Sequence, residues 1–326
     1  MRLVDSPENP APPGAIVSSI STADGLALRV ARFMPTGPCR GTVLIAAGRS
    51  EFIEKYFETI GELLQRHLAV VAFDWRGQGL SERELPDRTK GHIDDFALYL
   101  RDLDAVVGQV LHPHCPAPWF GLGHSMGGAI LLEAAHQGRS PFARLVLCAP
   151  MIELAMLGFP KLARGLAFLC DAIGLGGAFV PGGGRRSIIE KGFAGNPLTS
   201  DAQRFARLAA VIATEPQLSL GDPTIAWAHA AFRQMKKYAD PDYPRSIRVP
   251  TLIFAAQGDA IVDTRAIERF AARLKIGRMI LLGRAQHEIL LEHDAVRARF
   301  WAGFDAFVPG TAGEGQALLA RHGVVL

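Results

Sequence analysis

The chain has 326 residues, of which 49% are apolar and 21% are charged. The length is enough to bury a large core, and the composition excludes collagen-like, coiled-coil and wholly disordered proteins. A net charge of +3 is too balanced for a nucleic-acid-binding surface, so no nucleic-acid partner is expected. The four cysteines lack metal-ligand spacing, and although their number allows one or two disulfides, they are expected to be small buried apolar residues in a reducing compartment; they are Cys39, Cys115, Cys148 and Cys170.

The two ends of the chain carry little periodic pattern. Residues 1–14 are rich in proline and are predicted to be disordered, and residues 308–326 are predicted to form a C-terminal tail. The first 14 residues lack the apolar run of a secretory signal. The longest apolar stretch, residues 165–181, is broken by Asp171 and is too short to span a membrane. The sequence therefore predicts a cytoplasmic protein.

Short apolar runs alternate with longer helical patterns along most of the chain. Two β-branched runs, residues 15–21 and 26–33, flank Thr-Ala-Asp-Gly and predict a hairpin. Further strands are predicted over residues 42–47, 68–74, 119–122, 145–149, 251–256 and 278–282, and helices over 55–67, 92–111, 126–136, 264–274 and 293–307. This alternation predicts an α/β fold, with a mostly parallel central sheet and helices on both of its faces.

The alternation stops between residues 151 and 249. The pattern there is mostly helical, with breaks rich in glycine and proline. It predicts a largely helical cap (lid) inserted over the carboxyl edge of the sheet, where open α/β sheets bind ligands. The predicted core then comprises residues 15–150 and 250–307.

The strongest chemical motif is Gly-His-Ser-Met-Gly at residues 123–127. It follows a predicted strand and opens a predicted helix, and such a turn lifts the serine Oγ clear of the sheet. Ser125 is therefore the candidate nucleophile. A dinucleotide-binding fingerprint is the rival interpretation, but its last glycine position holds Met126, and the next strand ends at Ala149 without an acidic residue.

A serine nucleophile needs a base, and the base needs a carboxylate to orient it. In hydrolases with this motif the chain order is Ser, then Asp or Glu, then His. The strand over 251–256 leads into Asp259 and Asp263, and the strand over 278–282 leads into His287, the predicted base. Asp259 is the preferred carboxylate because it comes first after its strand. Asp263 remains the alternative, although it has the position of a helix N-cap.

An oxyanion hole needs two backbone N–H groups. The candidates are Met126, directly after the nucleophile, and Arg49, in the loop after the strand over 42–47. The Arg49 side chain is either solvated or in contact with an anionic group of the substrate. Asp74 ends another strand but is out of chain order, so a structural role is expected for it.

These residues resemble the α/β-hydrolase superfamily, and within it the bacterial lysophospholipase and monoacylglycerol lipase branch, over roughly residues 15–307. The resemblance rests on the motif at 123–128, on Phe-Asp-Trp-Arg-Gly-Gln-Gly-Leu-Ser at 73–81, on Gln-Gly-Asp-Ala-Ile-Val at 257–262 and on Gln-His-Glu-Ile-Leu at 286–290. Gly-Arg-Ser-Glu-Phe-Ile-Glu-Lys-Tyr at 48–56 and Gly-Asn-Pro-Leu-Thr-Ser-Asp at 195–201 resemble lysophospholipase-like members more particularly.

The resemblance implies a serine hydrolase with Ser125 as nucleophile, Asp259 as acid and His287 as base, and with the backbone of Arg49 and Met126 as oxyanion hole. It implies no metal and no organic cofactor. The implied reaction is hydrolysis of a lysophospholipid, a small-molecule substrate, to a fatty acid and a glycerophosphodiester.

Several alternatives remain open at this point. Monoacylglycerol lipases usually begin the oxyanion loop with His-Gly, whereas this chain has Ala47-Gly48, which favours a lysophospholipase. The alternative enzymatic hypotheses are a monoacylglycerol lipase, a broad carboxylesterase and an acyltransferase. A hypothesis from a different class is a non-catalytic binding protein with the hydrolase fold. The apolar stretch 151–184 fits an acyl pocket, a peripheral membrane contact or an ordinary cap. The pair at 185–186 is either solvated or in contact with a phosphodiester, and the oligomeric state stays unknown.

Overall fold

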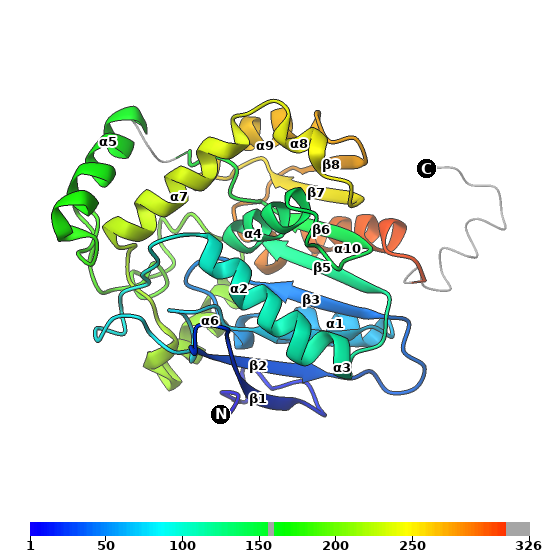
Figure 1. Ribbon diagram of the computed structural model, residues 1–326. Helices are drawn as coiled ribbons and strands as arrows, with labels where there is room; N and C mark the ends of the chain where they lie inside the picture. The colour runs from blue at the N-terminus through cyan, green and yellow to red at the C-terminus, as the bar shows by residue number, and fades with distance from the viewer. Residues whose placement is uncertain (156–159, 311–326) are drawn as a thin grey trace.

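The apolar runs pair into one eight-stranded sheet in a computed structural model that describes residues 1–155 and 160–310 (Figure 1). The strands are β1 (Ile16–Ser21), β2 (Ala27–Phe33), β3 (Thr42–Ala46), β4 (Ala69–Phe73), β5 (Trp119–His124), β6 (Arg144–Cys148), β7 (Thr251–Ala256) and β8 (Gly277–Leu282). Their order is β1-β2-β4-β3-β5-β6-β7-β8. β2 runs antiparallel to β1, as the predicted hairpin requires, and also to β4; all other neighbours are parallel, as predicted for a mostly parallel sheet.

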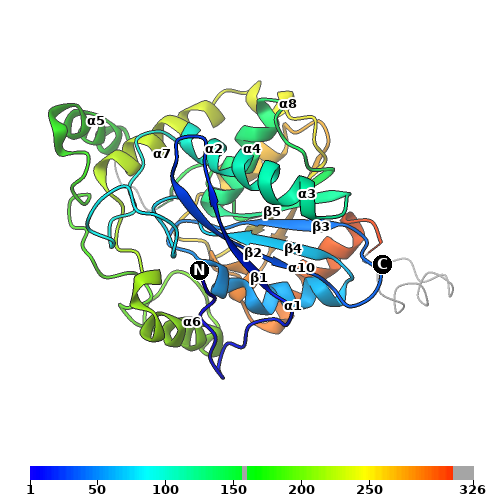
Figure 2. The ribbon, with the colours of Figure 1, turned by 60° about the horizontal axis from the view of Figure 1, so that its bottom comes forward.

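Helices cover both faces of the sheet. They are α1 (Phe57–Gln65), α2 (Ala97–Val106), α3 (His112–His114), α4 (Ser125–His136), α5 (Pro160–Cys170), α6 (Ala202–Thr214), α7 (Ile225–Tyr238), α8 (Tyr243–Ser246), α9 (Thr264–Ala271) and α10 (Asp294–Phe307), with shorter turns η1 (Ile53–Tyr56), η2 (Val107–Leu111), η3 (Asp171–Leu175), η4 (Pro216–Leu218) and η5 (Ile289–Leu291). Figure 2 shows α2, α3 and α4 over one face and α1 and α10 over the other. Because both faces are covered, β3, β4 and β7 are buried along their whole length.

Two predicted elements differ from the observed ones. The helix predicted over residues 92–111 begins at Ala97, because Gly91 forms a bridge with Pro223 and the Asp95 carboxylate accepts the backbone N–H of Ala97. The predicted disorder of residues 1–14 is also not what the structure has. Val4 is buried in an apolar cluster with α6 and donates its N–H to Glu54 Oε1 at 2.9 Å. Contacts with distant parts of the chain hold this proline-rich segment, and its own composition does not predict them.

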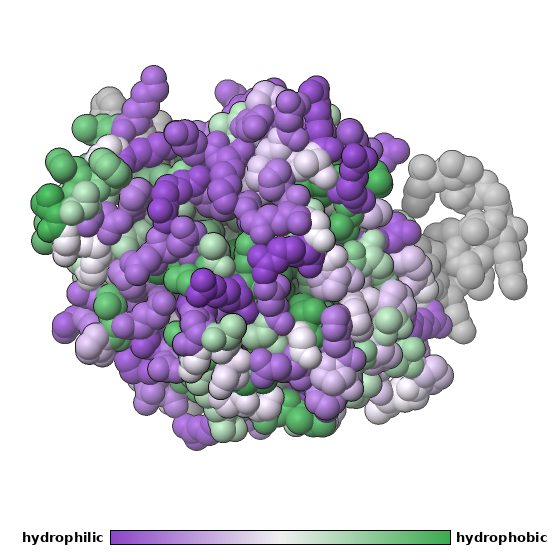
Figure 3. All heavy atoms as spheres, in the orientation of Figure 1, coloured by the Kyte–Doolittle hydropathy of each residue, from purple (hydrophilic) through white to green (hydrophobic). Residues whose placement is uncertain are grey.

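The insertion, residues 151–249, lies between β6 and β7 and contains α5 to α8. The arrows of β3, β5 and β7 in Figure 1 point toward the side where α5 and α7 lie. Apolar surface gathers over α5 in Figure 3, where Leu162, Phe168 and Leu169 are 70%, 59% and 57% exposed. Within the described residues, no helix is long and apolar enough to cross a membrane. All four cysteines are free, with Cys115 and Cys148 buried and the other two half-buried.

One buried carboxylate ties α4 to the insertion. Glu133 accepts hydrogen bonds from Tyr243 Oη at 2.5 Å, Gln234 Nε2 at 2.7 Å, Gln137 Nε2 at 2.7 Å and Lys237 Nζ at 2.8 Å. Burial raises the pKa of Glu133, but the hydrogen bonds, led by that from Lys237, outweigh burial and lower it to about 2. A depressed carboxyl pKa stabilises the fold above the ordinary glutamate value, and this stability is lost as the pH falls toward about 2.

Replacing Glu133 with Gln is expected to lower the free energy of unfolding at pH 7 by about 1–3 kcal/mol, because an amide N–H₂ then faces two of the donors. The difference in free energy of unfolding between wild type and variant should become smaller as the pH approaches 3, because the stability that the Glu133 carboxylate gives the wild type is then being lost. Urea unfolding at both pH values measures it, with exposed Glu268→Gln as the control. A deficit that does not change with pH would contradict this account of Glu133.

Candidate active site

The predicted nucleophile lies in a tight turn between β5 and α4. Ser125 has a φ of 47°, in the left-handed region that non-glycine residues rarely adopt. The turn presses against neighbouring backbone: a Cβ at Gly127 would lie 2.0 Å from the carbonyl O of Ala46, and one at Gly123 would lie 2.8 Å from Cα of Gly128. The expected strand-to-helix elbow is therefore present, and glycine is required on both sides of the serine.

The structure brings Asp259 and His287 together. Asp259 Oδ2 lies 2.8 Å from His287 Nδ1, while Oδ1 accepts the N–H groups of Ile261 and Val262 at 2.8 and 2.9 Å. Burial raises the pKa of Asp259, but the hydrogen bond from His287 and its charge outweigh burial, and the pKa is lowered. An ionised, fixed carboxylate therefore holds the imidazole through Nδ1.

The other two aspartates considered at the sequence level have different partners. Asp263 is the N-cap of α9 and accepts the N–H groups of Arg265 and Ala266. Asp74 is fully buried, accepts the N–H of Ile53 at 3.0 Å and pairs with Arg29. Both contacts are those of structural carboxylates.

His124 connects the serine turn to the histidine loop. It directly precedes Ser125, and its Nε2 lies 3.1 Å from the backbone O of His287. The rings of His124 and His287 are 4.8 Å apart between centroids. The turn that carries Ser125 and the loop that carries His287 are thus in direct contact.

The loop after β3 is held by side chains from the loop after β4. Trp75 Nε1 donates to the carbonyl O of Ala47 at 2.8 Å, and Gln78 Oε1 accepts the N–H of Ser50 at 2.6 Å. Between these anchors, the backbone N–H of Arg49 has no acceptor among the described residues. Met126 lies in the first turn of α4, where backbone N–H groups have no partner within the helix. Sequence reasoning missed Gln78, although the motif at 73–81 contains it.

The Arg49 side chain lies half-buried between this loop and the insertion. Its Nη2 donates to the carbonyl O of Gly221 at 2.8 Å, its Nη1 donates to Ser50 Oγ at 3.0 Å, and Cζ lies 5.2 Å from the ring centroid of Trp227. Within residues 1–155 and 160–310, Arg49 Nε has no hydrogen-bond partner, and no carboxylate forms an ion pair with the guanidinium. Burial lowers the pKa of Arg49 to about 10, so it remains a cation at neutral pH.

A buried charged cluster that sequence reasoning missed lies behind the site. Lys55 Nζ contacts Glu51 Oε1 at 2.7 Å and Glu288 Oε2 at 2.5 Å, and His124 Nδ1 contacts Glu51 Oε1 at 2.6 Å. Glu51, His124 and Glu288 could offer ligand atoms to a metal. However, the Lys55 ammonium already touches both carboxylates and supplies positive charge there. The cluster is therefore better described as an ion-pair network than as a metal centre.

Two hollows lie near the insertion. An apolar cavity of about 520 Å³ between α5 and α7 is lined by Leu162, Leu166, Trp227 and Phe232 among others, and by Asp222.

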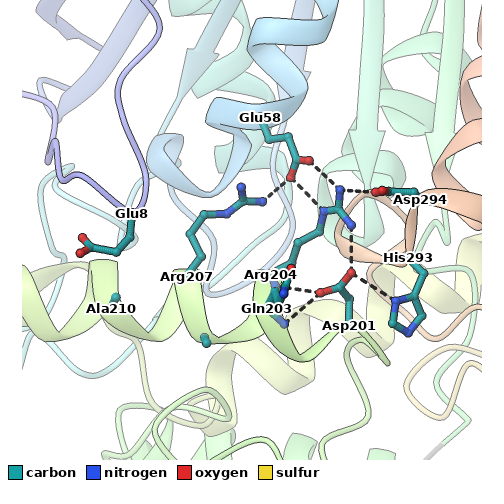
Figure 4. A pocket seen from close by; sticks show the side chains of 10 residues that line it. Glu8, Glu58, Asp201, Gln203, Arg204, Arg207, Ala210, His293 and Asp294 are labelled. Atoms are coloured by element: carbon teal, nitrogen blue, oxygen red, sulfur yellow. Dashed lines mark hydrogen bonds and ion pairs between the residues drawn. The ribbon is translucent and has the colours of Figure 1, made fainter.

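A second hollow, of about 780 Å³, separates α6 from α1 and the start of α10 (Figure 4). Its charged groups bind one another: Arg204 bridges Glu58, Asp201 and Asp294. None of the three candidate catalytic residues lines this hollow. Its ion pairs connect α6 to the core.

Comparisons with known proteins identify the family of this chain. The family model described as "Serine aminopeptidase, S33" matches residues 37–294. Lysophospholipase L2 of Escherichia coli is 31% identical over 289 residues, covering 84% of this chain and 82% of the relative. Probable lysophospholipase L2 of Haemophilus influenzae is 28% identical over 263 residues, covering 81% and 82%.

A solved structure shows the same fold. A soluble variant of monoglyceride lipase from Saccharomyces cerevisiae, in complex with a substrate analogue, superposes with a TM-score of 0.73 at 22% identity, over 91% of this chain and 97% of that chain. The sheet order, the elbow and the family match lead to one conclusion. The chain belongs to the serine aminopeptidase S33 family, in the lysophospholipase and monoacylglycerol lipase branch of the α/β-hydrolases, and is a serine hydrolase.

Proposed function

We propose that this hydrolase cleaves the acyl ester of a lysophospholipid, with Ser125 as nucleophile, His287 as base and Asp259 as the orienting carboxylate. The 2.8 Å contact between His287 and Asp259, in a loop that touches the Ser125 turn, is the observation that carries the mechanism. His287 takes the Ser125 proton as the serine attacks the carbonyl, and the N–H groups of Arg49 and Met126 bind the oxyanion. His287 then protonates the leaving glycerol oxygen, and water hydrolyses the acyl-enzyme.

The proposed substrate rests on the Arg49 cation and on the relatives named lysophospholipase L2. A half-buried guanidinium that pairs with no carboxylate of the described residues, next to the proposed oxyanion hole, suits the phosphodiester of a lysophospholipid. Trp227 contacts Arg49 and also lines the apolar cavity between α5 and α7. A volume of about 520 Å³ lies in the range of small-molecule sites, and we propose that the acyl chain enters there.

Replacing Arg49 with Gln is expected to raise KM for a lysophosphatidylcholine by roughly 10- to 100-fold, the effect of losing a charge-assisted hydrogen bond. Turnover of a monoacylglycerol, which lacks the phosphate, should change little. Arg185→Gln is the matched control, because Arg185 is 74% exposed and already pairs with Asp87. An equal loss on both substrates would contradict a head-group role for Arg49.

We further propose that the enzyme is cytoplasmic and touches the inner face of the membrane through the exposed apolar surface of α5 and η3. Leu169 and Ile173 are 57% and 65% exposed there and lie outside the lining of the apolar cavity. Leu166, which lines the cavity, is itself 44% exposed on the same surface, so an acyl chain would have a short path from bilayer to cavity.

Replacing Leu169 and Ile173 together with Ser is expected to weaken sedimentation with anionic phospholipid vesicles about tenfold or more, because both side chains lose apolar burial in the bilayer. Hydrolysis of a soluble short-chain ester should be unchanged. Undiminished vesicle binding would rule out this surface as the contact.

A further inference from the structure

Four buried ionisable side chains join the three segments that carry the proposed catalytic groups. Glu51 and Lys55 follow the oxyanion loop, His124 precedes Ser125, and Glu288 follows His287. Their side chains are between 3% and 7% exposed. The proposed mechanism uses none of them, so their cost in desolvation calls for another role.

Both ring nitrogens of His124 face groups that accept hydrogen bonds. Nδ1 lies 2.6 Å from Glu51 Oε1, and Nε2 lies 3.1 Å from the backbone O of His287. Glu51 is surrounded by donors: Oε1 also contacts Lys55, and Oε2 accepts the N–H of Gly48 and the Oη–H of Tyr56, each at 2.5 Å. With its lone pairs occupied by these donors, the Glu51 carboxylate has no place for a proton of its own. Two acceptors then require two N–H groups on the ring.

The charge of the cluster agrees with this geometry. Two carboxylates, one ammonium and one imidazolium sum to zero, whereas a neutral His124 would leave a buried net charge of −1. Burial lowers the pKa of His124, but Glu288 and Glu51 outweigh burial and raise it. Burial raises the pKa of Glu51, yet His124 and Lys55 bring it well below its ordinary value.

We infer that His124 is a permanent imidazolium. Together with Glu51, it positions the loop that carries His287, the proposed base, against the loop after β3, which carries the proposed oxyanion N–H of Arg49. One N–H holds the backbone carbonyl of His287. The other holds Glu51, whose second oxygen fixes the N–H of Gly48, directly before Arg49. Gly48 has no room for a side chain, since a Cβ would lie 2.5 Å from Glu51 Oε1 and 2.9 Å from His124 Nδ1.

This inference rests on the proposed roles of His287 and Arg49, and it has an electrostatic consequence. The rings of His124 and His287 lie only 4.8 Å apart between centroids, so a change of charge at His124 acts at short range on the proposed base. The titratable groups around His124 are Glu51, Lys55, Tyr56, Cys148, His287 and Glu288. Removing the charge of His124 leaves the remaining cluster at −1, which favours protonated His287. The acid limb of kcat/KM should then move to higher pH, by about one to two units for a unit charge at this distance.

Nuclear magnetic resonance of the ¹⁵N-histidine-labelled protein tests the protonation state directly. His124 is assigned by the signal lost in His124→Asn, or by the signal displaced in Glu51→Gln if the first variant does not fold. We expect both ring nitrogens to stay protonated from pH 6 to pH 9, whereas a free histidine is neutral above about pH 8. A neutral ring at pH 8 would overturn the inference. This spectrum requires no turnover, so its outcome is independent of the proposed substrate.

The pH profile of kcat/KM tests the positioning role, with any ester whose cleavage depends on Ser125. His124→Asn keeps one donor toward Glu51 but loses the charge; it should lower kcat roughly 10- to 100-fold and move the acid limb upward. His136→Asn is the matched control, because His136 ends α4, the helix that follows His124, and contacts Ser246 and Tyr243 instead. A lower rate with an unmoved acid limb would assign His124 a merely structural role and overturn the proposal.

Discussion

Replacing Ser125 with Ala is expected to lower kcat for ester hydrolysis by on the order of 10⁶-fold, with the fold retained. The magnitude follows because nucleophile, base and carboxylate act as a unit, so removing the nucleophile costs about as much as removing all three. The elbow should tolerate the change, since alanine lacks only the Oγ and backbone contacts such as Met151 N–H to Ser125 O remain.

Ser140→Ala is the control for this variant, because Ser140 lies in the loop after α4, where its Oγ accepts the N–H of the neighbouring Phe142 at 3.4 Å. A fluorophosphonate probe should label the wild type and the control at one site and leave Ser125→Ala unlabelled. Residual activity within 100-fold of the wild type would place the nucleophile elsewhere.

Replacing Arg29 with Met is expected to lower the free energy of unfolding by about 3–5 kcal/mol, because it leaves two carboxylates buried without a counter-charge. Arg29 is fully buried on β2. Its Nη1 and Nη2 lie 2.7 and 2.8 Å from the two oxygens of Glu54, and its Nε lies 2.8 Å from Asp74 Oδ2. The same guanidinium holds the N-terminal segment through the carbonyl O of Arg2 at 3.1 Å.

Denaturant unfolding measures this loss, with Arg32→Met as the matched control. Arg32 lies on the same strand, is half-buried and donates to the carbonyl O of His114 at 2.8 Å, so its loss should cost about 1 kcal/mol. Equal stability of the two variants would show that the buried charges near Arg29 are relieved by solvent or by protonation.

Local patterns carried most of the fold and the central part of the candidate site. The strands were predictable because each is a short, nearly continuous apolar run, which only a sheet covered on both faces accommodates. Ser125 could be located because its tight turn requires glycine on both sides. A side chain at Gly127 would collide with the carbonyl O of Ala46. The choice of Asp259 over Asp263 followed from the position of each after β7. In the structure Asp259 contacts His287, whereas Asp263 is the N-cap of α9.

Contacts between distant segments were beyond sequence reasoning. The His124–Glu51 pair joins residues 73 positions apart, and the Lys55–Glu288 pair joins residues 233 apart. All four residues lie in the motifs that carry the family resemblance, but nothing in these motifs indicates which residues pair, and only the folded chain brings them together. The segment of Val4 was misjudged for the same reason: its apolar cluster includes side chains of α6 and of the loop after β3, which are distant in the sequence.

The central claim is that Ser125 hydrolyses a lysophospholipid. Fatty-acid release should be measured from a long-chain lysophosphatidylcholine and, in parallel, from a monoacylglycerol, with the wild type and with Ser125→Ala. The account predicts release from the lysophospholipid that disappears in the variant. Ser125-dependent release from the monoacylglycerol alone would contradict the proposed substrate while keeping the mechanism, and release from neither would contradict both.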